Sequence, residues 1–377
     1  MTKMYEEMTV AEGNSRGDLA TRGRTATGRT PARVFVGMSG GVDSSVAAML
    51  LLNQGYDVTG IYMKNWSRDL PGMKCPWAED LADAKRVAVK LGIPFEVWDF
   101  EDAYREKVVE YMLREFKAGN TPNPDVMCNQ EIKFKLFYEK AMARGADFIA
   151  TGHYARKIDG KLARAVDENK DQTYFLYRIS KEALEHTLFP IGEMLKPDVK
   201  KLAEKNGLHN AYKKESMGVC FVGEVGMKDF LKEYIDIAPG EIREAETEKV
   251  LGYHEGAVFY TIGQRHGLYL SGEKGAVNDG LPYYVVRKDL AHNIVYVSKN
   301  LNHSAIWTKE LKLKDVFLRG YLSEARVLVR LRHRAPLVPA KFDGETLTFE
   351  SKIKRPASGQ SAVLYDGEIC LGGGIII

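Results

Sequence analysis

The stretch FVGMSGGVDSSV, from Phe35 to Val46, places three glycines and three serines between an apolar run and an amphipathic stretch. Residues 33–36 have the pattern of a strand, and residues 44–53 have the pattern of a helix closed by Gly55. A strand, a loop of small residues and a helix in this order begin a parallel α/β unit. Ligands of open parallel sheets gather at the carboxyl ends of the strands, so this loop is the first candidate for a binding site.

The residues of this loop predict that it holds phosphate. Gly40 and Gly41 can adopt backbone angles closed to other residues, so that successive N–H groups converge on an anion. Ser39 and Ser44 add hydroxyl donors, and the positive end of the following helix favours negative charge. The loop lacks both the Lys of a Walker motif and the GxGxxG spacing of a dinucleotide fold. The alternative is a tight turn that binds no ligand.

The remainder of the chain predicts three domains that differ in their pattern of strands and helices. We predict strands over 33–36, 57–62, 95–98 and 148–150, and helices over 44–53, 81–91, 103–117 and 131–144. After about residue 220 the pattern changes to short β-like runs broken by glycines. The fold class expected is therefore α/β: a doubly wound parallel-sheet domain over 33–221, a small mixed α+β domain over 222–298 and a C-terminal β-barrel domain over 299–377.

The N-terminal residues 1–32 are rich in Arg, Thr and Gly and have little apolar periodicity, so we expect a disordered tail. They contain no apolar core of a secretory signal, and their acidic residues count against a mitochondrial transit peptide. We find no apolar run long enough to span a membrane. Four cysteines without a CxxC pair argue against a secreted disulfide scaffold and a zinc ribbon. A reducing cytoplasm is the expected location.

Charge is distributed unevenly along the chain. The net charge is +3, yet residues 306–356 contain twelve Lys or Arg against six Asp or Glu. If residues 326–334 form a strand, four arginines share one face and form a basic stripe suited to phosphates: Arg326, Arg330, Arg332 and Arg334. This pattern predicts a polyanionic partner. The alternative is an ordinary solvated surface.

Two cysteines lie in loops that suit a reactive thiol. Cys128 follows Asp125 in a rigid, proline-rich loop just before a predicted helix, whose dipole favours a thiolate. Cys220 lies between glycines, and Lys213 and Lys214 precede it, which is also compatible with a lowered thiol pKa. For each of the two, the alternative is a small buried apolar residue. The other two cysteines, Cys75 and Cys370, have no such context, and we expect them to be structural.

A resemblance to known proteins rests on a series of motifs that occur in order from Arg33 to the C-terminus. The segment SGGVDS resembles the pyrophosphate loop of the ATP-pyrophosphatase superfamily. With it, the chain as a whole resembles the tRNA-specific 2-thiouridylase family in these segments: MKNW, CPWAEDLADA, AGNTPNPDVMCNQEIKF, ATGHYAR, KDQTYFLYRIS, LFPIGE, KKESMGVCF, YTIGQR, YYVVRKDL and CLGGGI.

This resemblance implies an ATP-dependent tRNA-modifying enzyme. ATP would adenylate the 2-carbonyl oxygen of the wobble uridine in tRNAs of the Lys, Glu and Gln type, and Mg²⁺ would neutralise the released pyrophosphate. The positions that match the family's ATP site are Gly37, Met38, Ser39, Gly40, Gly41, Val42, Asp43, Ser44, Met63 and Gly152.

The resemblance also implies how sulfur is transferred. Cys220 matches the family's persulfide carrier, which a cysteine desulfurase or a sulfur-relay protein loads. Cys128 matches the partner thiol, which either resolves the persulfide into a Cys128–Cys220 disulfide or helps to free sulfide as the nucleophile. Asp125 matches the acid/base residue. The two cysteines would have to meet beside the bound nucleotide.

Ten positions match the family's contacts with tRNA. They are Asn123, Pro124, Asp125, His153, Lys170, Asp171, Gln172, Arg332, His333 and Gln360. From the residues alone, His153 has an alternative role as a capping group at a strand end. The pair Arg332 and His333 replaces the Arg-Tyr common in bacterial members, so stacking on a base would be weaker or would use imidazole.

Two rival functions remain open on the sequence alone. One is a synthetase of the same superfamily that acts on a small carbonyl substrate, which leaves the loop cysteines without a role. The other is a non-catalytic RNA-binding protein, although the residues needed for chemistry are all present.

Overall fold

The computed structural model describes residues 30–69, 75–214, 226–268, 270, 281–320, 322 and 325–377. It divides into two compact units, which we call the first and the second unit. The first consists of Met1–Arg105 and Cys128–Gly223, and the second of Glu106–Met127 and Glu224–Ile377. The tail expected to be disordered lies almost wholly outside the described residues, as does Cys220.

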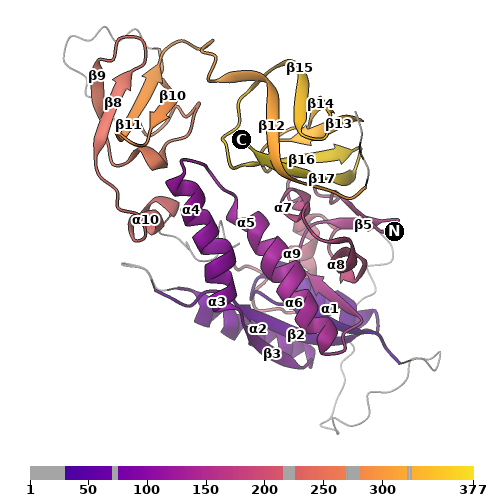
Figure 1. The fold of residues 1–377 in the computed structure, drawn as a ribbon. Helices are drawn as coiled ribbons and strands as arrows, with labels where there is room; N and C mark the ends of the chain where they lie inside the picture. Colours follow the sequence, from indigo (N-terminus) through magenta and orange to yellow (C-terminus); the bar gives the residue numbers. More distant parts are fainter. Residues whose placement is uncertain are drawn as a thin grey trace. The chain divides into compact units, whose positions relative to one another are not determined.

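The first unit is built on a parallel sheet of five strands in the order β3-β2-β1-β4-β7 (Figure 1). The strands are β1 (Arg33–Gly37), β2 (Asp57–Lys64), β3 (Phe95–Asp99), β4 (Phe148–Thr151) and β7 (Thr187–Leu188). The chain adds strands on one side of β1 and then crosses to the other side with β4. The SGGVDS loop follows β1 and therefore lies at the point where the strand order reverses, where doubly wound sheets bind ligands.

Helices cover both faces of this sheet, which confirms the predicted doubly wound fold. The apolar core on one face joins β1 residues such as Val34 and Val36 to α1 (Val42–Asn53), α2 (Trp77–Leu91) and α9 (Lys196–Lys205). On the other face the rings of Phe35 and Phe137 both lie 5.8 Å from the ring of Trp98. Phe137 opens α6 (Phe137–Ala143).

Two long helical segments differ in detail from the predicted helices. The first consists of α3 (Glu101–Tyr104), a π-helical turn (Arg105–Glu110) and α4 (Tyr111–Lys117). The second begins with α5 (Pro124–Met127), continues as a π-helix (Cys128–Leu136) and ends with α6. It starts well before the predicted residue 131, because Pro124 suits the first helical turn and the side chain of Asn123 accepts the N–H groups of Asp125 (3.2 Å) and Val126 (3.4 Å).

The rest of the first unit consists of short elements. These are β5 (Arg156–Ile158), β6 (Lys161–Ala163), α7 (Thr173–Leu176) and α8 (Lys181–Glu185). The strands β5 and β6 pair as an antiparallel hairpin that follows the segment 151–153.

The second unit contains two separate β structures, as predicted. A mixed sheet has the order β10-β11-β8-β9, in which only β11 and β8 are parallel. Its elements are α10 (Met227–Lys232), β8 (Gly240–Glu244), β9 (Val250–His254), a 3₁₀ turn (Ala257–Phe259), β10 (Tyr284–Asp289) and β11 (Ile294–Ser298). We call this part the central domain.

A β-barrel follows the central domain. It consists of β12 (Trp307–Leu318), β13 (Ala325–Arg330), β14 (Val338–Phe342), β15 (Thr346–Lys354), β16 (Ser361–Asp366) and β17 (Ile369–Ile376). Neighbouring strands pair in the order β12-β15-β14-β13-β16-β17, and β12 also pairs with β17, which closes the barrel.

The predicted arginine stripe is wrong. Strand β13 ends at Arg330, whose side chain is buried with its guanidinium 5.4 Å from the centre of the Tyr365 ring. The chain must then reverse to pair β13 with β14, so Arg332 and Arg334 lie in a turn. The N–H of Ala335 donates to the carbonyl of Arg332 at 3.0 Å, and Arg334 has a φ of 62°.

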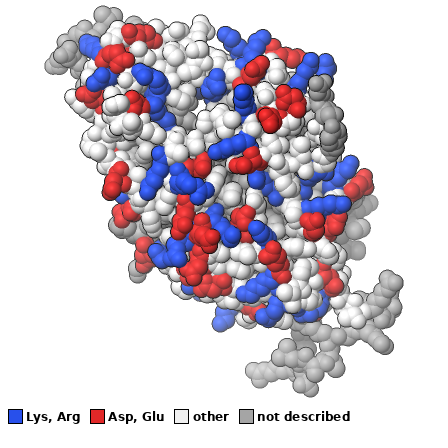
Figure 2. Space-filling view, in the orientation of Figure 1, with Lys and Arg blue, Asp and Glu red and all other residues white. Residues whose placement is uncertain are grey.

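Charges of both signs alternate on the face drawn in Figure 2, where Lys and Arg side chains are interspersed with Asp and Glu. That face therefore carries no large area of a single sign. Within the described ranges, no helix has the length and apolar character needed to cross a bilayer.

Candidate active site

The loop after β1 depends on glycine at two close approaches. Gly40 has a φ of +78°, and a Cβ atom there would lie 2.3 Å from the carbonyl oxygen of Asp80 in α2. A Cβ on Gly152, just beyond β4, would lie 2.5 Å from the backbone nitrogen of Ser44. No side chain fits at either point, so these glycines let three segments of backbone meet at the carboxyl edge of the sheet.

Hydrogen bonds within the loop hold its shape. The hydroxyl of Ser44 accepts from the N–H of Ser39 (3.2 Å) and donates to the carbonyl of Gly41 (3.1 Å). The hydroxyl of Ser45 donates to the same carbonyl at 2.9 Å. Gly41 is the N-cap of α1 and supplies no side-chain cap, so the first N–H groups of this helix face the loop. The carboxylate in the first turn, Asp43, is bound by Lys196. This arrangement suits a phosphate group.

The structure brings the predicted ATP-site residues together. A Cβ on Gly37 would lie 2.8 Å from the terminal methyl of Met63, which places Met63 against the start of the loop. Gly152 packs on Asp43 and Ser44 from the opposite side. Met38 and Val42 are buried in the core, so they contribute to the loop through their backbone. The ATP contacts themselves stay a prediction.

Asp43 has two partners that sequence reasoning missed. The ammonium group of Lys196, at the start of α9, lies 2.7 Å and 2.8 Å from the two carboxylate oxygens. The hydroxyl of Tyr154 donates to one of these oxygens at 3.0 Å. Lys196 is buried, so this pair fixes the direction of the Asp43 side chain. Neither partner is close to Asp43 in sequence, and no local pattern marks them.

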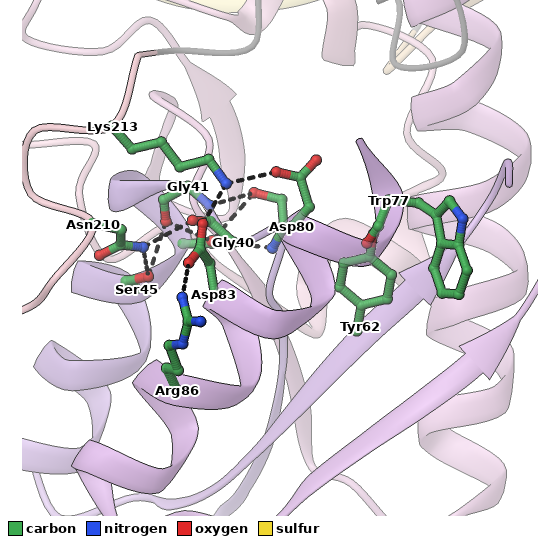
Figure 3. Close-up of polar contacts among 12 residues, drawn as sticks. Gly40, Gly41, Ser45, Tyr62, Trp77, Asp80, Asp83, Arg86, Asn210 and Lys213 are labelled. Atoms are coloured by element: carbon green, nitrogen blue, oxygen red, sulfur yellow. Dashed lines mark hydrogen bonds and ion pairs between the residues drawn. The ribbon is translucent and has the colours of Figure 1, made fainter. Parts of the chain in front are cut away.

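A second polar cluster supports the loop from the side of α2 (Figure 3). The ammonium group of Lys213 lies 2.7 Å from a carboxylate oxygen of Asp80 and 2.6 Å from one of Asp83. The amide of Asn210 donates to the carbonyl of Gly40 and to the hydroxyl of Ser45, both at 2.9 Å. The turn that contains Asn210 and Lys213 is thereby tied both to α2 and to the loop.

The lysine and the aspartates of this cluster stabilise each other in their charged forms. Burial tends to raise the pKa of Asp83, but hydrogen bonds from Lys213 and His209 outweigh it and lower that pKa. Burial likewise tends to lower the pKa of Lys213, and the bonds to Asp80 and Asp83 raise it overall. The sequence suggested that Lys213 lowers the pKa of a nearby thiol. In the structure the ammonium group of Lys213 binds two carboxylates, and its effect on the Cys220 thiol stays a prediction.

His153 is buried at the carboxyl end of β4. Its Nε2 atom lies 3.3 Å from the Lys133 ammonium, which can only donate, so Nε2 accepts and Nδ1 carries the proton. Nδ1 then donates to the hydroxyl of Thr151 at 2.8 Å. Burial first, and the Lys133 charge second, hold the pKa of His153 well below its usual value. His153 is therefore neutral. These contacts are compatible with its alternative role as a capping group at the end of a strand.

The segment Lys170–Gln172 packs inside the first unit. Asp171 is 1% exposed, and its carboxylate accepts hydrogen bonds from the backbone of Ala165 (3.2 Å) and the hydroxyl of Thr173 (2.9 Å). The side chain of Gln172 accepts from the N–H of Tyr154 at 2.8 Å. These two side chains hold the start of α7 in place. Their predicted contact with tRNA stays a prediction.

The two cysteine loops are described only in part. Cys128 is buried, at the point where α5 passes into the π-helix of the first unit. Asp125 belongs to α5 in the second unit. Cys220 lies outside the described residues, so the meeting of Cys128 and Cys220 stays a prediction. Burial raises the pKa of the Cys75 thiol, which agrees with a non-reactive role.

The remaining predicted tRNA contacts lie in the second unit. Arg332 is exposed and His333 is half-buried, both in the turn after β13. Gln360 precedes β16, and its amide donates to the carbonyl of Thr121 at 2.7 Å. Their contact with tRNA stays a prediction.

A resident metal site finds no support among the residues that the structure describes, since no three His, Cys, Asp or Glu side chains form a suitable group there. The carboxylate of Asp43 faces the loop but is bound by Lys196. Magnesium prefers one or two carboxylates together with substrate phosphates. The residues present therefore fit an ion that enters with a nucleotide.

Three family models together match nearly the whole chain. They are described as the tRNA methyl transferase HUP domain over residues 32–224, the tRNA methyl transferase PRC-barrel domain over residues 228–299 and the aminomethyltransferase beta-barrel domain over residues 307–376.

Curated relatives cover the same extent. The tRNA-specific 2-thiouridylase MnmA of Pseudomonas syringae pv. syringae is 46% identical over 355 residues, which are 91% of this chain and 94% of the relative. The protein of the same description from Listeria monocytogenes serotype 4a is 46% identical over 363 residues, 93% of this chain and 96% of the relative.

Solved structures are similar over about half of the chain. A U34-tRNA thiolase NcsA from Methanococcus maripaludis matches with a TM-score of 0.33 and 17% identity, over 54% of this chain and 64% of that chain. A 4-thiouridine synthetase in complex with RNA and ATP matches with a TM-score of 0.36 and 15% identity, over 54% of this chain and 50% of that chain.

Proposed function

We propose a reaction and its residues from the premise that this chain belongs to the tRNA-specific 2-thiouridylase family. The enzyme is an ATP-dependent tRNA-uridine 2-sulfurtransferase: it adenylates the 2-carbonyl oxygen of a uridine and replaces that oxygen with sulfur. The observation that carries this function is the 46% identity to a 2-thiouridylase over 91% of the chain. The finer parts, namely the wobble uridine of Lys, Glu and Gln tRNAs and the residues for each step, rest on the matching motifs.

In the first step, ATP binds with its phosphates on the loop from Gly37 to Ser44. Backbone N–H groups and the positive end of α1 face the phosphates, and the preformed hydrogen bonds of Ser39 and Ser44 reduce the reorganisation needed on binding. Lys196 offsets the charge of Asp43, which would otherwise repel the nucleotide. Magnesium bound to ATP would neutralise the leaving pyrophosphate.

The uridine oxygen then attacks the α-phosphate, and pyrophosphate leaves. The product is an adenylated uridine in which AMP has become the leaving group at carbon 2. We assign contact with the base and the tRNA to Asn123, Pro124, Asp125, His153, Lys170, Asp171, Gln172, Arg332 and His333.

Sulfur transfer requires both cysteines. The terminal sulfur of a Cys220 persulfide attacks carbon 2, and AMP leaves. The thiolate of Cys128 attacks the inner sulfur of Cys220, which releases 2-thiouridine and forms a Cys128–Cys220 disulfide. In the alternative order, Cys128 first releases sulfide, which then attacks carbon 2. In both orders a cysteine desulfurase or relay protein supplies the persulfide, a thiol reductant restores the cysteines, and Asp125 acts as the acid/base residue.

Mass spectrometry of nucleosides from tRNA incubated with ATP, magnesium and a desulfurase with cysteine tests this proposal. We expect 2-thiouridine from the wild type and none from Cys128→Ser or Cys220→Ser. Cys75→Ser is the matched control and should keep full activity, because burial keeps that thiol protonated. If the wild type forms methylated uridine instead, or if both serine variants remain active, the proposal is wrong.

A further inference from the structure

The three residues Gly119 to Thr121, which we call the anchor segment, directly precede the stretch proposed to meet the target base. In the second unit, the central domain and the barrel both bind this segment. The ammonium group of Lys288 in β10 donates to the carbonyl of Gly119 at 2.8 Å. From the barrel, the amide of Gln360 donates to the carbonyl of Thr121 at 2.7 Å, and the carbonyl of Ser358 accepts the N–H of Thr121 at 2.8 Å.

The anchor segment packs closely against both domains. Gly359 has a φ of +89°, and a Cβ there would lie 2.9 Å from Asn120 Cβ and 3.0 Å from Thr121 N. Gly119 has a φ of +81°, and a Cβ there would lie 2.6 Å from a methyl group of Leu290. Both glycines suit the positive backbone angle, and Gly359 is also needed for space, because it approaches the backbone of Thr121. The segment is therefore enclosed by the two domains rather than resting on one of them.

Lys288 is an unusual residue for this position. Burial lowers its pKa from 10.5 to about 8, and no carboxylate partner offsets that effect in the described part of the chain. A half-buried cation that binds only a backbone carbonyl costs free energy relative to an apolar side chain of similar size. The contact adds little to stability, so its value lies in fixing where Gly119 is held.

We propose that Lys288 and Gln360 are positioning residues: each holds one carbonyl of the anchor segment, and through it they set the place of Asn123, Pro124 and Asp125. The path is short, since the buried Pro122 follows Thr121 and the side chain of Asn123 caps the helix that carries Asp125. The placement of these residues thus depends on the two C-terminal domains. This inference rests on the proposed function, because it takes Asp125 to take part in the reaction.

A positioning role differs in its kinetics from the tRNA contact that the sequence predicts for Gln360. Loss of a tRNA contact weakens tRNA binding and raises KM, whereas misplacement of the reacting groups lowers kcat. Displacements of about 1 Å can lower a rate about a hundredfold. The two roles are therefore separable with variants that keep the size of the side chain.

The experiment measures kcat and KM of thiolation, the Kd for tRNA and hydrogen exchange of residues 118–127, in wild type, Gln360→Glu and Lys288→Met. Each variant removes one donor. We expect kcat to fall about ten- to a hundredfold, with KM and Kd for tRNA within about threefold of wild type. Exchange should become faster in residues 118–127. Lys249→Met, an exposed lysine of the same central domain, is the matched control and should change none of these quantities.

The double variant adds an independent check. Because both residues hold one segment, we expect the double variant to lose much less than the product of the two single losses. A higher Kd for tRNA with unchanged kcat in Gln360→Glu, or unchanged exchange in both single variants, would overturn the inference. Absence of 2-thiouridine from the wild type would instead contradict the proposed function, and the exchange measurements would still decide whether the segment is held.

Discussion

The ammonium group of Lys196 lies 2.7 Å and 2.8 Å from the two carboxylate oxygens of Asp43. It joins the first turn of α9 to the loop after β1, and the exposed fractions of the two side chains are 8% and 28%. A cation so placed performs two tasks. It satisfies a carboxylate that is largely withdrawn from water, and in the proposed reaction it would reduce the negative potential that an incoming triphosphate meets.

Replacement of Lys196 by methionine removes both effects. We expect Lys196→Met to lower the free energy of unfolding by about 2–3 kcal/mol, because the Asp43 carboxylate loses its partner. ATP affinity should fall as well. Urea unfolding and calorimetric titration with ATP measure the two quantities. Lys201→Met on the same helix is the control: its side chain is 76% exposed, so it should change stability by no more than about 0.5 kcal/mol. Equal effects of the two variants would contradict this prediction.

The two adjacent loop glycines should differ sharply in their tolerance of alanine. At Gly40 both the positive φ and the 2.3 Å approach to the Asp80 carbonyl oppose a Cβ atom. At Gly41, φ is −82° and the new atom would lie 3.4 Å from the Ser39 hydroxyl. We expect thermal or urea unfolding to show a loss of about 2–4 kcal/mol in Gly40→Ala and less than about 1 kcal/mol in Gly41→Ala. Similar losses would mean that the loop relaxes around either side chain.

His153 should make stability depend on pH on the acid side of neutrality. Its folded-state pKa lies well below 6.5 because of burial, with the Lys133 charge as a second cause. Below pH 6.5 the unfolded state therefore binds a proton that the folded state does not, and stability falls as the pH falls. The contribution amounts to about 1.4 kcal/mol per pH unit.

The difference between wild type and His153→Gln isolates this contribution, since glutamine does not titrate and most other groups cancel. Urea unfolding at a series of pH values should show the advantage of the wild type decreasing as the pH drops below 6.5. A constant difference across this window would show that His153 is protonated in the folded protein as readily as in the unfolded chain.

Because of Lys288, we expect the free energy of unfolding to depend on pH in the alkaline range. Burial lowers its folded-state pKa from 10.5 to about 8, so between these values the unfolded state holds a proton that the folded state has released. Stability relative to Lys288→Met should therefore rise as the pH increases through this window. The total gain is about 3 kcal/mol, and little change is expected below pH 8. Denaturant unfolding of both proteins from pH 7 to 10.5 provides the test, and an unchanged difference would place the ammonium group in water.

Local sequence determined most of the fold and the position of the loop after β1. Alternating apolar strands and amphipathic helices specified the parallel sheet, because burial on both faces of a strand leaves a recognisable run of residues. The glycines of SGGVDS specified the loop, since only glycine permits the backbone angle and close approach found at Gly40. At residues 326–334 the predicted strand was too long. Arginines continue at alternate positions beyond Arg330, where the chain turns to pair β13 with β14.

Only the tertiary structure revealed the partners of these local features. Lys196, Tyr154, Asn210 and Lys213 reach the loop or its support from segments more than a hundred residues away in sequence, and Lys288 and Gln360 reach the anchor segment in the same way. A single lysine or asparagine carries no sign of which carboxylate or carbonyl it will bind. That choice follows from how strands and helices pack, because packing brings distant side chains within the 3 Å or so that a hydrogen bond requires.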